Sequence, residues 1–135
     1  MTAVVDPQVV WERWTNIEKW PADTPTIVRA QLNGPVAQGA VGWMKPRRGP
    51  RASFRIVEVN RMAGHFEIEA KLLLGRITIE RFLNRSESGP DGAWMLTHRV
   101  VFSGPMARIW NRVIGRNLTR IVPEVLARIA AIAAI

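Results

Sequence analysis

The chain has 135 residues, 47% of them hydrophobic and 22% charged, so we expect one domain over residues 1–135 that folds without a metal or disulfide. The absence of cysteine excludes disulfides, thiolate nucleophiles and cysteine metal sites. The net charge of +8 suits a polyanionic partner, but tyrosine is absent and the six tryptophans do not alternate with basic residues. We therefore expect no base-stacking platform and no nucleic-acid partner.

The N-terminal segment predicts a short helix over Pro7 to Asn16. Asp6 can cap the free amides of the first turn, and Pro7 suits the first helical position. Trp20-Pro21 is expected to end any continuation, because the residue before a proline is pushed out of the α region. The segment Asp23 to Pro25 is expected to be a loop.

No segment has the pattern of a signal peptide, because no basic region precedes a long apolar run near Met1. The longest apolar tail, Ile129 to Ile135, is far shorter than the ~20 residues that a bilayer span needs. We therefore expect a cytoplasmic protein.

The middle of the chain predicts a series of strands separated by turn residues. The expected strands are Ile27 to Leu32, Ala40 to Lys45, Arg51 to Asn60, His65 to Leu73, Arg76 to Arg85 and Ala93 to Ser103. Within the fourth, Phe66, Ile68 and Ala70 alternate with charged residues, as half-buried strands do. Short connections between the strands predict an antiparallel meander, since parallel pairs would need long crossovers.

The segment from Met106 to Ile135 predicts one long amphipathic helix that starts after Pro105. Its apolar stripe contains Ile109, Trp110, Val113, Ile114, Leu118, Ile121, Val125, Ile129 and Ile132. Arg108, Arg112, Arg116 and Arg120 recur every fourth residue roughly opposite that stripe. Pro123 removes one hydrogen bond and is expected to bend the helix. The apolar face needs a partner, which the strands can supply.

This layout comes with motifs that resemble a known family. Val10-Trp11, the segment Trp14 to Pro21, and Leu32-Asn33-Gly34-Pro35 with Gly39 are similar to the opening and first turn of polyketide cyclase/dehydrase-like proteins of the START/Bet v 1 superfamily. Leu96 to Val100 and Ser103 to Met106 are similar to that family's last strand and its Gly-Pro entry to the final helix.

The resemblance covers nearly the whole chain and implies an α+β helix-grip fold, in which a curved antiparallel sheet wraps around a long C-terminal helix. It also implies an internal apolar cavity for lipids, sterols, polyketides or similar compounds. Two features depart from the family. The first strand can only be the stub Thr2 to Val5, and Arg81 stands where many relatives have histidine.

A curved sheet and one helix enclose a wedge, and sites of this kind are concave and mostly apolar. The candidate lining residues are Trp43, Phe54, Ile56, Phe66, Ile68, Ile79, Trp94, Leu96, Trp110, Ile114 and Leu118. The alternative is that these residues form a plain packed core, since native interiors leave few voids.

Three polar residues belong to the candidate site. Alternation places His98 on the apolar face of its strand, where it could act as an acid or base toward a bound carbonyl or could be a hydrogen-bonded core histidine. Glu80 and Arg81 are adjacent in a strand and must point to opposite faces, so one of them faces the wedge. The sequence does not decide which.

Several other chemistries find no support in the sequence. Two histidines without cysteine are too few good ligands for a transition metal, so we expect neither a metal nor a cofactor. No Gly-rich phosphate loop or nucleophile elbow is present. The leading hypothesis is a binding protein for an apolar small molecule. The alternatives are a polyketide cyclase or dehydrase that uses His98, and weak contact of Arg108, Arg112, Arg116 and Arg120 with an anionic membrane.

Overall fold

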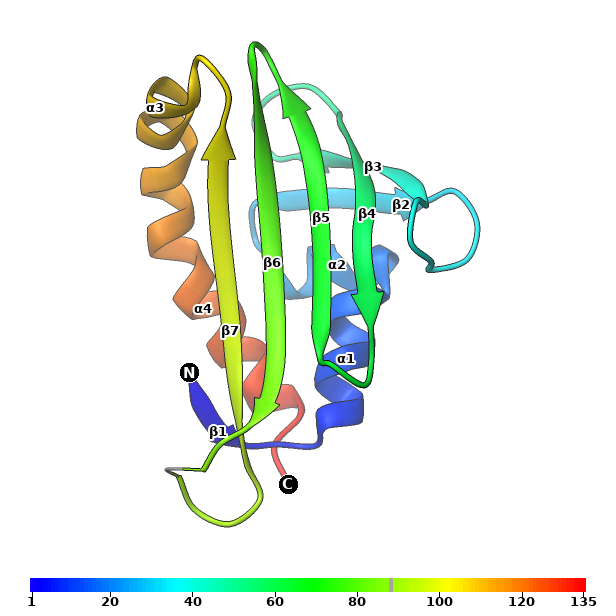
Figure 1. The fold of residues 1–135 in the computed structure, drawn as a ribbon, viewed down its shortest axis with the longest axis vertical. Coiled ribbons are helices and arrows are strands. Elements are labelled where there is room, and N and C mark those ends of the chain that lie inside the picture. The colour runs from blue at the N-terminus through cyan, green and yellow to red at the C-terminus, as the bar shows by residue number, and fades with distance from the viewer. Residues whose placement is uncertain (88) are drawn as a thin grey trace.

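An antiparallel sheet dominates the computed structural model, which describes residues 1–87 and 89–135 (Figure 1). Within these residues the sheet has seven strands in the order β1-β7-β6-β5-β4-β3-β2. The strands are β1 (Thr2–Val4), β2 (Ile27–Leu32), β3 (Val41–Pro46), β4 (Ala52–Asn60), β5 (His65–Leu72), β6 (Gly75–Arg85) and β7 (Ala93–Ser103). Each strand from β2 to β7 pairs with the next, which confirms the expected meander, and the stub β1 pairs with β7.

The N-terminal helical region is longer than expected. Helix α1 (Pro7–Thr15) begins at the predicted cap, where the backbone N–H of Gln8 donates to Asp6 Oδ1 at 3.0 Å. It is followed by the 3-10 turn η1 (Ile17–Lys19) and by the one-turn helix α2 (Trp20–Asp23). The expectation that Trp20-Pro21 stops helical structure is wrong, because Pro21 lies in the first turn of α2, where its missing N–H costs nothing.

The C-terminal helix is divided into three parts. They are α3 (Ala107–Trp110), the π-helical turn η2 (Asn111–Gly115) and α4 (Arg116–Ile132), and Pro123 lies inside α4. A Cβ atom on Gly115 would lie 2.3 Å from Asn111 Oδ1 of the preceding turn and at ordinary contact distance, 3.5 Å, from the ring of Phe102 on β7. In the described part of the chain, no helix combines the length and the apolarity needed to cross a bilayer.

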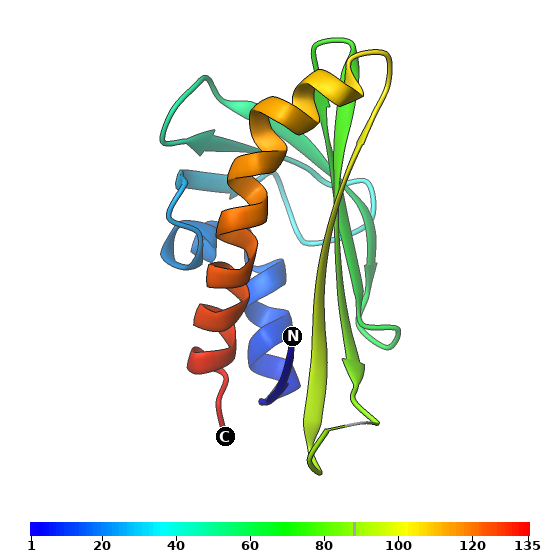
Figure 2. The same cartoon turned by 90° about the vertical axis from the view of Figure 1, so that its left-hand side faces the viewer.

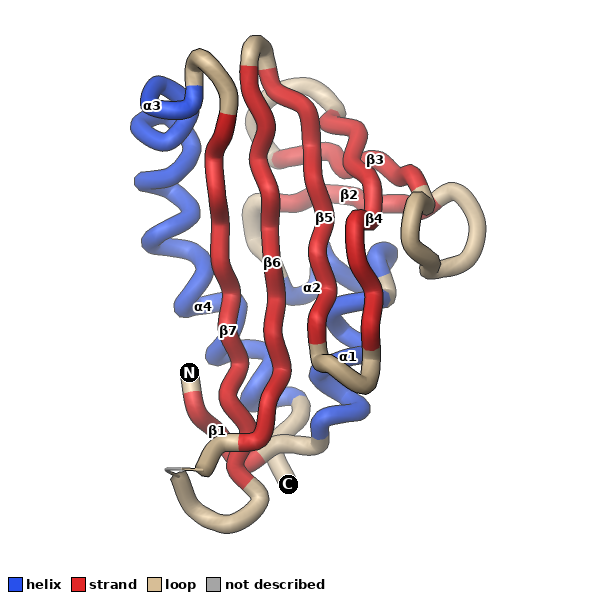
Figure 3. Tube along the Cα trace, viewed as in Figure 1, coloured by secondary structure: helices blue, strands red, loops and turns tan. Residues whose placement is uncertain are grey.

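The helices lie on the concave side of the sheet, and the α3-η2-α4 segment runs along it (Figures 2 and 3). Two clusters of buried residues hold the layers together. One joins α1, α4, β6 and β7 through residues that include Val10, Trp14, Leu83, Leu96, Ile121, Val125 and Ile129. The other joins η1 and α2 to β2, β4 and β5 through Ile17, Trp20, Ala30, Phe54, Ile56, Phe66, Ile68 and Ala70. The predicted helix-grip fold is thus present.

Ile129 and Ile132 test this packing as a matched pair on one helix. Ile129 is buried in the cluster between α4 and α1, whereas Ile132 is about half exposed. We expect Ile129→Ala to lower the free energy of unfolding by about 2–5 kcal/mol, because it leaves a cavity in the core. Ile132→Ala should change the same free energy by no more than about 0.5 kcal/mol. Denaturant unfolding measures both, and equal effects would contradict the placement of α4.

Candidate functional site

Arginine 81 lies on the concave face of the sheet. In the pairing of β6 with β7, Arg81 is opposite His98, with the inward-facing pair Leu83 and Leu96 next to it along the strands. On the other side Arg81 is paired with Phe66 of β5. Residues that are directly opposite in an antiparallel sheet share one face and have Cβ atoms about 4.5–5.5 Å apart. The register therefore brings a cation and an imidazole together inside the fold.

The side chain of Arg81 is held by the short helix α2. Its guanidinium carbon lies 5.4 Å from the centre of the Trp20 ring, and the residue is only 8% exposed. Burial lowers the pKa of Arg81 to about 10, while the negative charge of Asp23 acts in the opposite direction. Arg81 thus remains positively charged at neutral pH.

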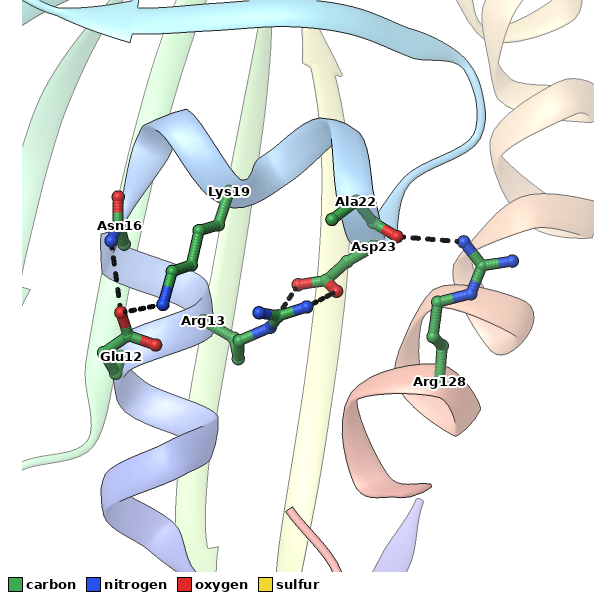
Figure 4. A network of polar contacts seen from close by, with 7 residues as sticks. All are labelled: Glu12, Arg13, Asn16, Lys19, Ala22, Asp23 and Arg128. Atoms are coloured by element: carbon green, nitrogen blue, oxygen red, sulfur yellow. Dashed lines mark hydrogen bonds and ion pairs between the residues drawn. The ribbon is translucent and has the colours of Figure 1, made fainter. Parts of the chain in front are cut away.

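Asp23 forms an ion pair with a different arginine, Arg13 (Figure 4). Both oxygens of its buried carboxylate accept hydrogen bonds from Arg13 of α1, with Arg13 Nε at 3.0 Å from Oδ2. Arg128 of α4 donates to the backbone oxygen of Ala22 at 3.1 Å and fixes the same turn. Among the described residues no hydrogen bond joins Asp23 to Arg81, so Asp23 acts on Arg81 only through its field.

Arg81 and His98 have polar atoms without a protein partner. In the described part of the structure, Arg81 Nε and both ring nitrogens of His98 are inaccessible to solvent and have no hydrogen-bond partner. Burial, together with the positive charge of Arg81, lowers the pKa of His98 to about 3. His98 is therefore neutral at pH 7. Buried polar groups are nearly always paired, so these unpaired donors and acceptors mark the site as unusual.

Apolar residues flank the Arg81–His98 pair on both sides along the strands. Below the pair, Leu83 and Leu96 are fully buried. Above it, the inward-facing residues of β6 and β7 and the matching stripe of the helix are only partly buried: Ile77, Ile79, Val100, Phe102, Ile114 and Leu118. Ile114 and Leu118 continue the stripe whose next members, Ile121 and Val125, pack in the core. The apolar residues next to the pair are therefore fully buried on the side of Leu83 and Leu96 and only partly buried on the side of α3.

The structure separates the predicted lining residues into three groups. Ile79, His98, Ile114 and Leu118 are partly buried, and Ile79 packs against the second core cluster. Phe54, Ile56, Phe66, Ile68 and Leu96 also face inward but are buried in the two core clusters. Trp94 packs against the core at the far end of β7 beneath the guanidinium of Arg85, and Trp110 donates its indole N–H to the backbone oxygen of Leu73.

Two expected lining residues face the other way. Gly42 and Met44 of β3 pair with inward-facing partners, so the intervening Trp43 must lie on the convex face, where it stacks with Arg51 at 3.9 Å and Arg29 at 5.7 Å. Glu80 likewise lies on the convex face, since its neighbour Arg81 points inward. The period of two along a strand explains the correction at Trp43, and it also decides between the two alternatives, with Arg81 inward and Glu80 outward.

The sequence did not predict the residues around Arg81, which are Trp20 beside its guanidinium and the Arg13–Asp23 pair farther away. The segment that contains Trp20 and Asp23 reads as a helix stop followed by a loop, and charged residues in a loop are normally solvated. A buried aspartate ten residues after an arginine could only be recognised once the chain between them was known to fold back.

The convex face brings together His65, Glu67 and Glu80, whose potential ligand atoms lie within 4.8 Å of one another. Burial raises the pKa of Glu67, and the neighbouring Glu80 raises it further. Arg99 Nε lies 3.6 Å from Glu80 Oε2, and the ring of Phe82 stacks on His65. An arginine thus already supplies the positive charge beside these carboxylates, and we assign no metal to them.

Two surface depressions lie away from the Arg81–His98 pair. One, of about 360 Å³, lies between α1, η1 and the β2–β3 turn and is lined by Glu12, Thr15, Asn16, Ile17, Glu18, Leu32, Gly34, Pro35 and Val36. The other, of about 330 Å³, lies where the β5–β6 turn meets the end of β7 and is lined by Gly75, Arg76, Ser103, Gly104 and Pro105. Neither contains an inward-facing charged residue.

Solved structures with the same arrangement identify the fold. Ara h 8.0201 superposes on this chain with a TM-score of 0.74 at 12% identity, covering 98% of this chain and 93% of that one. The chain has the Bet v 1-like helix-grip fold. Norcoclaurine synthase from Thalictrum flavum, in complex with dopamine and hydroxybenzaldehyde, matches with a TM-score of 0.66 at 10% identity, covering 98% of this chain and 82% of that one.

Two further solved structures also superpose on this chain. A hypothetical protein from Helicobacter pylori matches with a TM-score of 0.78 at 7% identity over 98% of this chain and 84% of that one. The di-domain ARO/CYC protein StfQ of the steffimycin biosynthetic pathway has a TM-score of 0.69 at 13% identity, and the match covers 98% of this chain but 42% of StfQ. By sequence, neither the protein-family models nor the curated proteins compared give a match.

The depressed pKa of His98 predicts a specific dependence of stability on pH. Between about pH 6.5 and pH 3 the unfolded chain binds a proton at His98 that the folded chain does not, so this residue makes stability fall as the pH falls through that window. His98→Gln keeps a polar side chain but cannot titrate. We expect the unfolding free energy of this variant, measured by denaturant at pH 7 and pH 5, to fall less than that of the wild type. Equal falls would show that His98 protonates freely in the folded state.

Proposed function

We propose that this protein binds an apolar small molecule that carries a carboxylate, with the carboxylate at Arg81 and His98 and the apolar part between the sheet and the C-terminal helix. The observation that carries the proposal is the buried guanidinium of Arg81, which has no hydrogen-bonded carboxylate among the described residues.

The electrostatics of Arg81 favour an anionic group. An unpaired charge in a protein interior is costly, and a hydrogen-bonded partner of opposite charge offsets that cost. Asp23 contributes only through its field, because Arg13 occupies both of its oxygens. A guanidinium presents donors in a planar fork that matches a carboxylate. His98, neutral and with unpaired nitrogens, can donate one further hydrogen bond to the same group.

The surroundings of Arg81 favour an apolar remainder. The inward-facing side chains between the pair and α3 are aliphatic or aromatic, and they are only partly buried. Covering them with a ligand would remove apolar surface from water, which stabilises a complex by about 25 cal/mol per Å² before the costs of association. An alkyl chain, a sterol or a polyketide-like compound meets this requirement. The helix-grip fold, which norcoclaurine synthase uses to hold two small aromatic compounds, is consistent with it.

A cyclase or dehydrase that uses His98 as an acid or base has weaker support. A general acid or base works best with a pKa near the operating pH, and the pKa of His98 is far below it. In the register of β6 and β7, the other titratable residue on the face of Arg81 and His98 is Arg85, which is exposed and lies over the ring of Trp94, and no carboxylate shares that face. We therefore place His98 in the binding of a ligand.

Replacing Arg81 should distinguish the contribution of the ligand's carboxylate to affinity from that of its apolar part. We expect Arg81→Met to weaken binding of dodecanoate, measured by calorimetry, by roughly 10- to 100-fold, because a charge-assisted hydrogen bond contributes about 1.5–3 kcal/mol. Binding of methyl dodecanoate, which has the same chain but no charge, should change far less. Arg99→Met is the matched control, since Arg99 pairs with Glu80 on the convex face.

The control and the ester decide how a negative result is interpreted. Equal affinity of wild type and Arg81→Met for dodecanoate, with Arg81→Met still folded by circular dichroism, would contradict the role of Arg81. Equal losses in Arg81→Met and Arg99→Met would point to a general effect of protein charge. Failure of the wild type to bind either compound would contradict the binding of alkyl carboxylates altogether.

A further inference from the structure

Two leucines form the turn between β5 and β6. Leu72 pairs with Gly75, so Leu73 and Leu74 are the whole turn, and they are 70% and 62% exposed. Leu74 has a φ of 51°, a conformation in which glycine and asparagine are favoured and a leucine is strained. Folding by itself would favour glycine or asparagine at position 74, so the two exposed leucines of this turn call for a different explanation.

The turn is fixed against the start of the C-terminal helix. The indole N–H of Trp110 donates to the backbone oxygen of Leu73 at 2.8 Å, and the backbone N–H of Met106 donates to that of Leu74 at 3.1 Å. A Cβ atom on Gly104 would lie 2.8 Å from Gly75 Cα, so the two segments touch through their backbones. Figure 2 shows the β5–β6 turn beside α3 at one end of the molecule. The leucines are therefore held in place at that end.

Exposed apolar side chains continue from the turn onto the helix. Ile109 of α3 and Val113 of η2 are each more than half exposed, and they lie one turn apart on the same side of the helix. We call Leu73, Leu74, Ile109 and Val113 the apolar tip. Single exposed apolar residues are common, but several gathered at one end of a protein mark an interaction surface.

The apolar tip lies beside a purely basic stretch. Arg108, Arg112 and Arg116 of the same helix are exposed, and no ion pair involves them in the described part of the chain. No acidic residue occurs between Asp91 and Glu124 in the sequence. The β5–β6 hairpin adds Lys71 and Arg76 near its tip, and Arg76 forms an ion pair with Glu69 at 3.6 Å. This end of the molecule is therefore apolar at its extremity and positive around it.

We propose that this end docks on a bilayer surface that contains anionic lipids. Protruding leucine, isoleucine and valine side chains can enter the boundary of the acyl chains, and the arginines can then lie at the depth of the headgroups. Each basic residue near an anionic surface adds attraction, and apolar insertion adds a part that salt does not screen. Docking brings the partly buried apolar residues between α3 and the ends of β6 and β7 near the membrane. This docking does not require the ligand proposed above.

Sedimentation with vesicles tests the docking. We expect the wild type to bind vesicles of phosphatidylcholine with phosphatidylglycerol and to bind vesicles of phosphatidylcholine alone at least roughly tenfold more weakly, because several charges act together. The double variant Leu73→Asn/Leu74→Asn should lose at least roughly tenfold in affinity for the anionic vesicles. Its melting temperature should be no lower than that of the wild type, since asparagine tolerates the conformation of Leu74.

Matched controls exist elsewhere on the chain. Met62→Ser removes an almost fully exposed apolar residue from the β4–β5 turn, which lies at the opposite end of the sheet (Figure 1). Arg47→Gln/Arg48→Gln removes two exposed charges from the β3–β4 loop, for comparison with Arg108→Gln/Arg112→Gln on the helix. We expect both controls to bind anionic vesicles as the wild type does, and the helix variant to bind them more weakly.

Three results would overturn the proposal. One is a wild type that ignores anionic vesicles at low salt. A second is equal loss of vesicle binding in the helix variant and the β3–β4 loop variant, which would show only general attraction of charge. The third is an asparagine variant that binds vesicles unchanged while the helix variant loses binding to a DNA duplex, which would indicate a nucleic-acid surface instead.

Discussion

The position of Arg81 on the inner face of the sheet determines how this protein can act. A strand alternates its side chains strictly between two faces, so a cation that follows the outward-facing Glu80 has to enter the grip. The interior does not neutralise it with a direct ion pair, because Arg13 holds both oxygens of Asp23. It offers instead the face of Trp20 and a more distant negative charge. The guanidinium of Arg81 is therefore available to form an ion pair with a negatively charged ligand.

The packing around Arg81 decides where that partner can lie. One core cluster fills the space below the arginine with α1 and α4, and the other fills the space toward β2 with η1 and α2. Ile77 and Ile79 of β6 pack against the second cluster, while Val100 and Phe102 of β7, opposite them in the register, stay partly exposed and are not among the residues of either cluster. The division of the final helix by a π turn coincides with this region, and such turns are frequent at functional sites. Entry is thus expected from the end that carries the apolar tip.

The sequence predicted the fold well because its signals were local and repeated. The alternation of Phe66, Ile68 and Ala70 indicates a strand with one buried face, and the stripe from Ile114 to Ile129 indicates a helix with one buried face. The Gly and Pro residues mark the turns between these elements. The strand limits followed to within one residue, and the α+β helix-grip arrangement followed from their order. The short helix α2 was not predicted, because a single turn shows no hydrophobic period. The proline in its first turn was also interpreted as the end of a helix.

The site was harder to predict because it depends on contacts between distant segments. That either Glu80 or Arg81 faces inward could be deduced, but the register with Phe66 and His98 was needed to choose Arg81. Trp43 was expected to line the wedge, whereas its neighbours Gly42 and Met44 take the inward positions of β3. The residues around Arg81, which are Trp20 and the more distant Arg13–Asp23 pair, come from a fold-back of the chain that has no signature in the sequence.

Nuclear magnetic resonance of the arginine side chains tests the central claim most directly. If ¹⁵N-labelled protein is titrated with dodecanoate, the Nε–H resonance of Arg81 should shift to a saturating limit, because the carboxylate becomes its hydrogen-bond partner. The Nε–H resonance of Arg99, on the convex face, should stay where it is. Saturable shifts elsewhere in the protein with no change at Arg81 would show that the ligand binds without it, and would contradict this account of the site.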